Sequence, residues 1–157
     1  MEVNIVMDMK AFDIYKFASQ GYCCSQILIL LVLEKEGREN FDLVRAANGM
    51  CGGMQCKGTC GILSGVIMAF GLYAGRGRAL EEKSLKLKAM ADEFTTWFTI
   101  EYKSTLCSEL VEVDIYTNEG DEVYPVKCGD MILKAYNKLQ EILEEFEYEL
   151  GERENGE

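Results

Sequence analysis

The stretch that decides the fold runs from Asn48 to Gly77 and reads NGMCGGMQCKGTCGILSGVIMAFGLYAGRG. It holds nine of the chain's fifteen glycines and three of its seven cysteines. Its first half, Gly49 to Thr59, has too much glycine for a helix interior and too few β-branched residues for a strand, which favours a loop. Its second half, Gly61 to Gly75, is uncharged and would form a helix about 22 Å long. Because this is shorter than a membrane span, the run predicts a central helix buried in the core.

The composition of the whole chain excludes several classes of function. A length of 157 residues with 48% apolar content predicts one domain, residues 1–150, followed by a disordered tail, residues 151–157. The net charge is -11 and no basic cluster stands out, so nucleic acid and anionic membranes are poor partners. The chain has no histidine, which excludes Ser-His-Asp and Cys-His catalytic pairs, histidine-ligated haem and mixed Cys-His zinc sites.

The N-terminal residues have no basic leader followed by an apolar segment, so we expect no secretory signal and a cytoplasmic location. In a reducing compartment, seven cysteines serve as metal ligands or redox thiols more often than as a disulfide framework. The cysteines are therefore the first candidates for function.

The rest of the chain predicts further helices around the central one. We expect an all-α fold, a compact bundle of about five to six helices with a glycine- and cysteine-rich loop before the central apolar helix. A small hairpin or irregular excursion is expected over Val113 to Val126. The predicted helices are Met9 to Gln20, Cys23 to Lys35, Phe41 to Ala47, Gly61 to Gly75, Arg78 to Lys103 and Cys128 to Leu150.

Four cysteines fall at or near the start of a predicted helix: Cys24, Cys60, Cys107 and Cys128. Unpaired backbone N–H groups at a helix start lower the pKa of a thiol and stabilise its thiolate. Gly61 directly follows one of these cysteines and leaves room for a bulky cofactor beside the sulfur. The alternative is that the four are buried as small apolar residues. The chain has no CxxC pair, and Cys51, Cys56 and Cys60 match no ferredoxin spacing.

Several short motifs, in order, resemble the C_GCAxxG_C_C family of small helical redox proteins. Cys24 precedes Ser25-Gln26, Gly49 to Gly53 is rich in glycine, and Cys60 to Gly65 reads CGILSG. Cys107 and Cys128 stand where the family has its third and fourth cysteines. Ile62 replaces the family's alanine, and Cys51 and Cys56 are additional thiols. A related domain occurs in split-Soret-type cytochromes, although haem is not implied because the chain has no histidine and no CxxCH site.

The resemblance implies an oxidoreductase or electron-transfer component in which four cysteines meet. The implied ligands of an iron-sulfur cluster, such as [2Fe-2S], are Cys24, Cys60, Cys107 and Cys128, with Cys51 and Cys56 as possible extra ligands. An alternative is a metal-free protein in which the same cysteines are the redox thiols and undergo thiol-disulfide exchange. A second alternative is a structural zinc site of four cysteines. A redox protein is the expected partner, and the small-residue face of Gly61, Gly65 and Ala69 predicts a homodimer.

Overall fold

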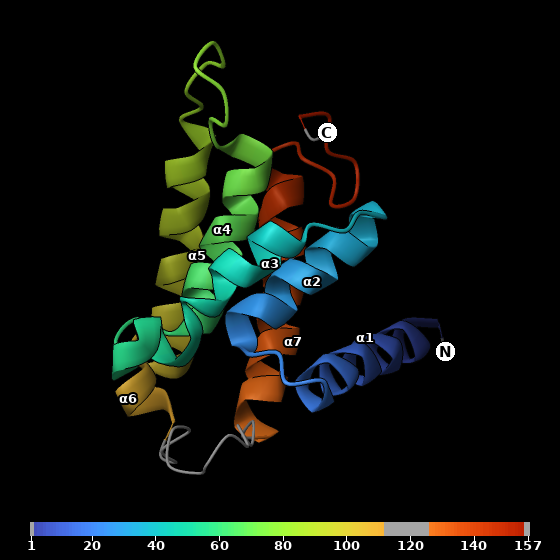
Figure 1. Ribbon diagram of the computed structural model, residues 1–157, viewed down its shortest axis with the longest axis vertical. Coiled ribbons are helices and arrows are strands. Elements are labelled where there is room, and N and C mark those ends of the chain that lie inside the picture. Colours follow the sequence, from blue (N-terminus) through green and yellow to red (C-terminus); the bar gives the residue numbers. More distant parts are fainter. Residues whose placement is uncertain (1, 112–125, 156–157) are drawn as a thin grey trace.

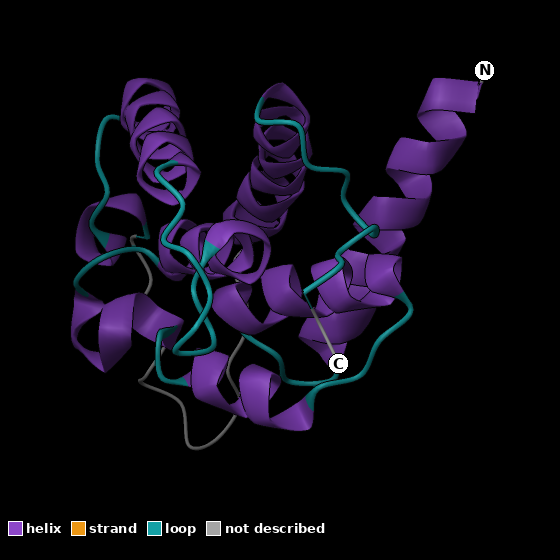
Figure 2. Cartoon of the chain, turned by 90° about the horizontal axis from the view of Figure 1, so that it is seen from above, coloured by secondary structure: helices purple, strands orange, loops and turns teal. Residues whose placement is uncertain are grey.

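The computed structural model describes residues 2–111 and 126–155, and in these residues the protein is all helical. Seen from above, the described residues are helices joined by loops (Figure 2). This confirms the predicted all-α class. The predicted excursion over Val113 to Val126 lies outside the described residues except for Val126, which begins the last helix. The elements are α1 Glu2–Ser19, α2 Cys24–Glu36, α3 Phe41–Asn48, the π-helical turn η1 Gly53–Lys57, α4 Gly61–Ala74, α5 Lys86–Tyr102, α6 Cys107–Leu110 and α7 Val126–Glu145.

The uncharged run forms α4, which contacts α2, α5 and α7 at the centre of the fold (Figure 1). Its Val66, Ala69 and Phe70 are fully buried, which confirms the predicted core helix. A Cβ atom on Gly65 would lie only 3.0 Å from the Cα of Ser25, so the backbones of α2 and α4 approach closely at this point. The small-residue face is therefore covered at Gly61 and Gly65 by α2 of the same chain.

The helices α2, α5 and α7 pack against α4, and α3 packs against α2. The brief predicted helix after Asn40 is α3, and the Asn40 side chain accepts a hydrogen bond of 3.0 Å from the N–H of Leu43, a typical N-cap. Edge-to-face packing joins Phe70 of α4 to Phe94 of α5, with ring centroids 6.1 Å apart. The fully buried residues of the surrounding helices include Ile27, Leu28, Leu31, Met90, Phe94, Phe98, Ile132, Ala135, Leu139 and Ile142.

The helix α5 begins later than its apolar pattern predicts, at Lys86 instead of Arg78. The reason is local hydrogen bonding in the preceding turn. The Glu81 carboxylate accepts the N–H groups of Gly77 at 2.7 Å and of Arg78 at 3.3 Å. The Ser84 hydroxyl then accepts the N–H of Lys86 at 3.1 Å, a group that would bond to a backbone carbonyl if the helix ran through this turn.

Two other helix ends also differ from the predicted ones. The first helix begins at Glu2 and not at Met9, and it ends at Ser19. The last helix ends at Glu145 and not at Leu150. The backbone of Glu147 has a φ of 69°, a left-handed conformation that cannot continue an α-helix.

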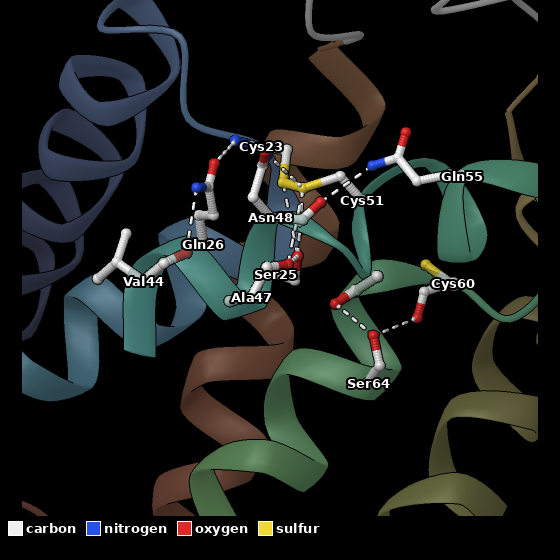
Figure 3. Close-up of a disulfide and its surroundings, with 11 residues drawn as sticks. Cys23, Ser25, Gln26, Val44, Ala47, Asn48, Cys51, Gln55, Cys60 and Ser64 are labelled. Carbon is white, nitrogen blue, oxygen red and sulfur yellow. Dashed lines mark hydrogen bonds between the residues drawn. A yellow bond between two sulfur atoms is a disulfide. The ribbon is translucent and has the colours of Figure 1, made fainter. Parts of the chain in front are cut away.

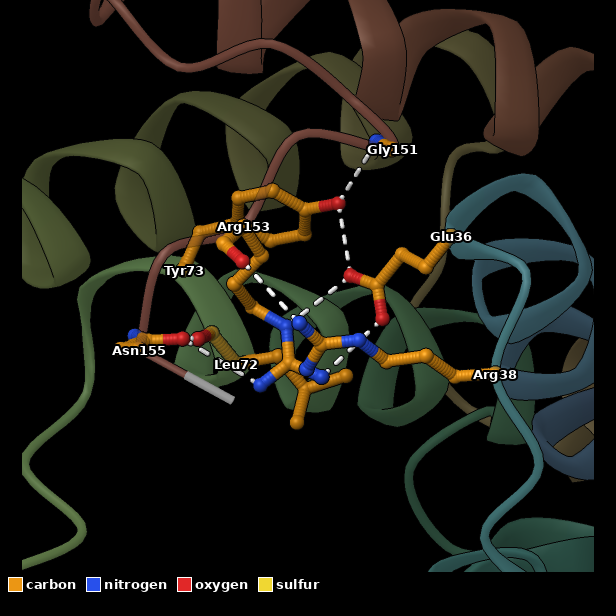
Figure 4. A network of polar contacts seen from close by, with 7 residues as sticks. All are labelled: Glu36, Arg38, Leu72, Tyr73, Gly151, Arg153 and Asn155. Carbon is orange, nitrogen blue, oxygen red and sulfur yellow. Dashed lines mark hydrogen bonds and ion pairs between the residues drawn. The ribbon is translucent and has the colours of Figure 1, made fainter. Parts of the chain in front are cut away.

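Residues 151–155 fold back onto α2 and α4, which differs from the predicted disordered tail (Figure 4). The Arg153 guanidinium donates two hydrogen bonds to the Glu36 carboxylate, at 2.9 and 3.0 Å. The Tyr73 hydroxyl donates to Glu36 at 2.8 Å and accepts the N–H of Gly151 at 3.0 Å. The two charged side chains are only 11% and 1% exposed, so this bidentate ion pair holds the segment in place.

Candidate cysteine redox site

A short antiparallel contact brings Cys60 and Cys107 together. Thr59 and Leu106 form an isolated β-bridge between the loop before α4 and the turn before α6. The N–H of Cys60 donates to the carbonyl of Thr105 at 2.8 Å, and the N–H of Cys107 donates to the carbonyl of Gly58 at 2.7 Å. The two cysteines, 5% and 8% exposed, therefore start α4 and α6 side by side.

The third cysteine of this group, Cys24, is the first residue of α2 and is 7% exposed. Its sulfur lies 2.5 Å from the position that a Cβ atom on Gly61 would occupy. The absence of a side chain at Gly61 thus makes room for the Cys24 sulfur next to Cys60. The structure therefore places Cys24 and Cys107 near Cys60, although the three belong to separate segments of the chain.

Glycine also shapes the loop that faces Cys107. Gly53 has a φ of 64°, and a Cβ atom there would lie 2.6 Å from the backbone of Gly58 and 2.8 Å from the Cβ of Cys107. Only glycine fits this left-handed position in such a small space. The predicted glycine-rich loop therefore packs directly against the cysteine group.

The electrostatics of Cys60 differ from the predicted low-pKa thiol. The N–H groups of Ile62 and Leu63, at the start of α4, do lower the pKa as expected for a helix N-terminus. Burial and the neighbouring Cys24 and Cys107 outweigh them and raise the pKa of Cys60 to about 12. The prediction of a low pKa is wrong for this residue because loss of hydration penalises a buried thiolate more than the helix start stabilises it.

The fourth predicted cysteine, Cys128, lies in the first turn of α7 and is 7% exposed. The same turn carries Asp130. Burial raises the pKa of the Tyr102 hydroxyl to about 12, and the negative charges of Glu101, Cys60 and Asp130 add to this shift. Tyr102 therefore lies within electrostatic reach of both Cys60 and the first turn of α7.

A separate pair of sulfurs is formed by Cys23 and Cys51, which the structure joins in a disulfide (Figure 3). Their Cα atoms are 5.9 Å apart, and the two residues are 3% and 5% exposed. The bond ties the start of α2 to the residues that follow α3. No pattern in the sequence marked Cys23 as a partner of Cys51.

Polar side chains at the start of α2 surround this disulfide (Figure 3). The Ser25 hydroxyl lies 3.5 Å from the Cys23 sulfur and 3.4 Å from the Cys51 sulfur, and it donates to the Ala47 carbonyl at 2.7 Å. The Gln26 amide accepts the N–H of Cys23 at 3.2 Å and donates to the α3 backbone. Ser25 and Gln26, part of the family motif, therefore fasten α2 to α3 near the cysteines.

The remaining cysteine, Cys56, is exposed on η1, and its thiol donates to the Gly53 carbonyl at 3.5 Å. Cys51 and Cys56, the two possible extra ligands, thus have different settings, one in a buried disulfide and one at the surface. Within residues 2–111 and 126–155, no three Cys, Asp or Glu side chains are arranged as a ready metal site. The ligand set stays a prediction.

Sequence reasoning missed Tyr102, the last residue of α5. Its hydroxyl oxygen has less than 1 Å² of exposed surface and no hydrogen-bond partner among the described residues. Only the packed structure reveals this, because no local pattern distinguishes this tyrosine from the other seven.

One family model matches residues 22–142, most of the chain, and its description is "Putative redox-active protein (C_GCAxxG_C_C)". The match covers all seven cysteines. No curated protein and no solved structure matches the chain. No helix in the described residues is long and apolar enough to cross a membrane.

Proposed function

The chain belongs to the C_GCAxxG_C_C family of redox-active proteins, and from that premise we propose that it binds an iron-sulfur cluster for electron transfer. The proposed ligands are Cys24, Cys60, Cys107 and Cys128. The observation that carries the proposal is the convergence of the first three, all buried, beside Gly61. Four thiolates are the usual ligand set of [2Fe-2S] and [4Fe-4S] clusters, which accept and release electrons when bound.

The raised pKa of Cys60 supports a metal site over thiol-disulfide exchange. Burial and the neighbouring sulfurs raise the pKa of the Cys60 thiol, so it stays protonated at neutral pH and is a poor nucleophile. Burial and adjacent sulfurs cause this shift, and a metal cation would offset both effects by its positive charge. The same surroundings that disfavour thiol exchange therefore suit metal ligation.

The buried Tyr102 hydroxyl also fits a bound group. A polar atom without a partner is uncommon in a protein interior and calls for an explanation such as a missing ligand or ion. Sulfur atoms of iron-sulfur clusters accept hydrogen bonds from nearby donors. The hydroxyl is thus a donor that the described residues leave available.

A second candidate function is thiol-disulfide redox chemistry without metal, which the Cys23–Cys51 disulfide favours. In that case two electrons and two protons pass between this pair and another dithiol or disulfide. The low exposure of both residues, 3% and 5%, argues against direct attack by a bulky partner. We therefore rank this function second, and a structural zinc site third.

The setting of the proposed activity follows from composition. We infer a redox protein as electron partner and the cytoplasm as compartment, because a chain in which one pair of its seven cysteines forms a disulfide still suits a reducing environment. The small-residue face from which the homodimer was predicted is covered by α2, so a homodimer would have to use another surface, and the mass of the protein in solution tests it.

The test is to measure iron, acid-labile sulfide and zinc per chain, with a visible spectrum, on protein purified without oxygen. We expect stoichiometric iron and sulfide and an absorbance that reduction bleaches. Zinc without iron would instead indicate a structural site, and metal-free protein with a reversible disulfide would support thiol redox chemistry.

Single serine variants then assign the ligands. We expect Cys24→Ser, Cys60→Ser, Cys107→Ser and Cys128→Ser each to lose iron. The matched control is Cys56→Ser, since this thiol is exposed and outside the proposed set. Full iron content in Cys107→Ser together with loss in the control would refute the assignment.

A further inference from the structure

The segment of residues 52–57, which we call the η1 loop, has a costly backbone conformation. Five of its residues have left-handed φ angles of 59° to 64°: Gly52, Gly53, Met54, Gln55 and Lys57. The two glycines adopt this conformation easily, but the side chains of the other three disfavour it. Such a run of residues persists only where the surrounding structure holds it in place.

The η1 loop is fastened at both ends. Before its first residue, Cys51 is bonded to Cys23, the residue that precedes α2 (Figure 3). After its last residue, the Gly58 carbonyl accepts the N–H of Cys107 at 2.7 Å, next to the β-bridge between the loop and the turn before α6. Of these two fastenings, only the disulfide depends on redox conditions.

The η1 loop also covers Cys107. The η1 turn contacts α6 and lies beside it (Figure 1). Gly53 is buried, and a Cβ atom there would lie 2.8 Å from the Cβ of Cys107. Cys107 is 8% exposed, whereas Cys56 on the loop itself is exposed. A loop that moved away from α6 would therefore uncover the Cys107 thiol.

We propose that the Cys23–Cys51 disulfide is a redox latch, whose reduction releases the η1 loop and exposes Cys107. After reduction the two sulfurs are no longer bonded and must move apart, which shifts the segments that carry them because the interior is close-packed. The freed loop then leaves its left-handed conformation, since that conformation is the one that costs free energy. Access to Cys107 is thus governed by the redox state of a different pair of sulfurs.

The reductant is a dithiol. Its two S–H bonds are lost as it forms an S–S bond, and two electrons and two protons pass to Cys23 and Cys51, whose S–S bond breaks to give two thiols. Both residues are buried, so attack follows local opening of the structure. A latch opens once per signal and tolerates this slow step, whereas a thiol-exchange enzyme needs rapid turnover. No metal takes part, so the inference does not require the proposed cluster.

The experiment measures how fast iodoacetamide modifies Cys107 in folded, metal-free, full-length protein, with mass spectrometry of the peptides as readout. Wild type is labelled with its disulfide intact, and again after treatment with dithiothreitol that is removed before labelling. Labelling of Cys23 and Cys51 reports that their bond was reduced. The exposed Cys56 serves as the internal reference for reagent reactivity. Helical circular dichroism of each sample reports whether the fold persists.

We expect reduction to speed labelling of Cys107 about 10-fold or more, with the helical signal and the Cys56 rate unchanged. Cys23→Ser cannot form the bond and should label Cys107 rapidly with or without dithiothreitol. Cys56→Ser is the matched control, because it removes a cysteine but keeps the latch. It should label Cys107 as wild type does in both states.

A second pair of variants tests the backbone strain without touching the disulfide. Met54 is 53% exposed, so shortening its side chain removes little packing. Met54→Gly makes the left-handed conformation easy, whereas Met54→Ala removes the side chain but keeps the Cβ atom that disfavours it. In the reduced state, Cys107 should be labelled several-fold more slowly in Met54→Gly than in Met54→Ala, which should resemble wild type.

Three results would overturn the inference. One is an unchanged Cys107 rate in protein whose Cys23 and Cys51 are reduced. Another is loss of the helical signal on reduction, which would mean that the bond holds the whole fold and not the loop. The third is equal labelling of the two reduced Met54 variants, which would refute strain as the cause. None of these measurements uses iron, so the proposed function is judged separately by its iron content.

Discussion

Replacing Gly65 with alanine tests the close approach of α2 and α4, on which the cysteine group depends. The new Cβ would lie 3.0 Å from the Cα of Ser25, 3.2 Å from a methyl carbon of Leu28 and 3.3 Å from the Ser25 carbonyl oxygen. Two of these three atoms belong to backbone, which cannot move aside as a side-chain end can. The two helices must therefore separate, or the buried side chains around them must shift.

The magnitude follows from two opposing effects. Overpacking a well-filled interior costs about 1–3 kcal/mol. Replacing a glycine inside a helix by alanine raises the free energy of unfolding by about 0.5–1 kcal/mol. Gly71 provides a matched control in the same helix, because a Cβ atom there would meet nothing within 4 Å. Both variants gain the same helix stability from replacing glycine with alanine. Their difference in unfolding free energy therefore measures the steric cost alone, about 1–3 kcal/mol.

The assay is urea unfolding of wild type, Gly65→Ala and Gly71→Ala under reducing conditions, followed by helical circular dichroism. We expect Gly71→Ala to be more stable than wild type and Gly65→Ala to be less stable. Equal stability of the two variants, with equal dependence on urea, would show that α2 and α4 do not approach as closely as described.

Three further predictions concern charge and the cysteine group. Because burial raises the pKa of Cys60 to about 12, the metal-free folded state keeps this proton where the unfolded state loses it. The unfolding free energy should thus fall above about pH 9, by up to about 1.4 kcal/mol per pH unit, and Cys60→Ser should lack this component in a pH series of urea titrations. Gly61→Ala should displace the Cys24 sulfur, which lies 2.5 Å from the new Cβ, and reduce iron content far more than it reduces the thermal midpoint. Arg153→Ala leaves the buried Glu36 carboxylate without its cationic partner and should cost about 3 kcal/mol in urea unfolding. Alanine at the exposed Arg45 should cost less than about 0.5 kcal/mol, and similar losses in the two variants would refute the role of the ion pair.

Much of the fold was predictable because its signals are local. The uncharged run that became α4 and the cap at Asn40 are short-range features, and the structure confirms both. The predicted start of α5 and the predicted end of α7 were wrong because single side chains and backbone angles decide where these helices begin and end. Glu81 and Ser84 bind backbone groups before α5, and the left-handed Glu147 ends the last helical stretch.

The candidate site was predictable only in part. Helix starts at Cys24, Cys60 and Cys107 follow from the sequence, and the structure has each of them at a helix start. The raised pKa of Cys60 and of Cys107 did not follow from the sequence, because the local helix dipole says nothing about the degree of burial. The Cys23–Cys51 disulfide was also missed, since the two residues are 28 positions apart and no spacing rule connects them.

By itself, the sequence determined the helical class, the central apolar helix and the family, because periodicity, glycine content and cysteine order are properties of neighbouring residues. The tertiary structure alone decided which sulfurs meet. The bridge between Thr59 and Leu106 brings Cys107 beside Cys60, and burial then sets the acidity of Cys60 and leaves the Tyr102 hydroxyl unpaired. These features depend on contacts between distant segments and on exclusion of water, which no local pattern encodes.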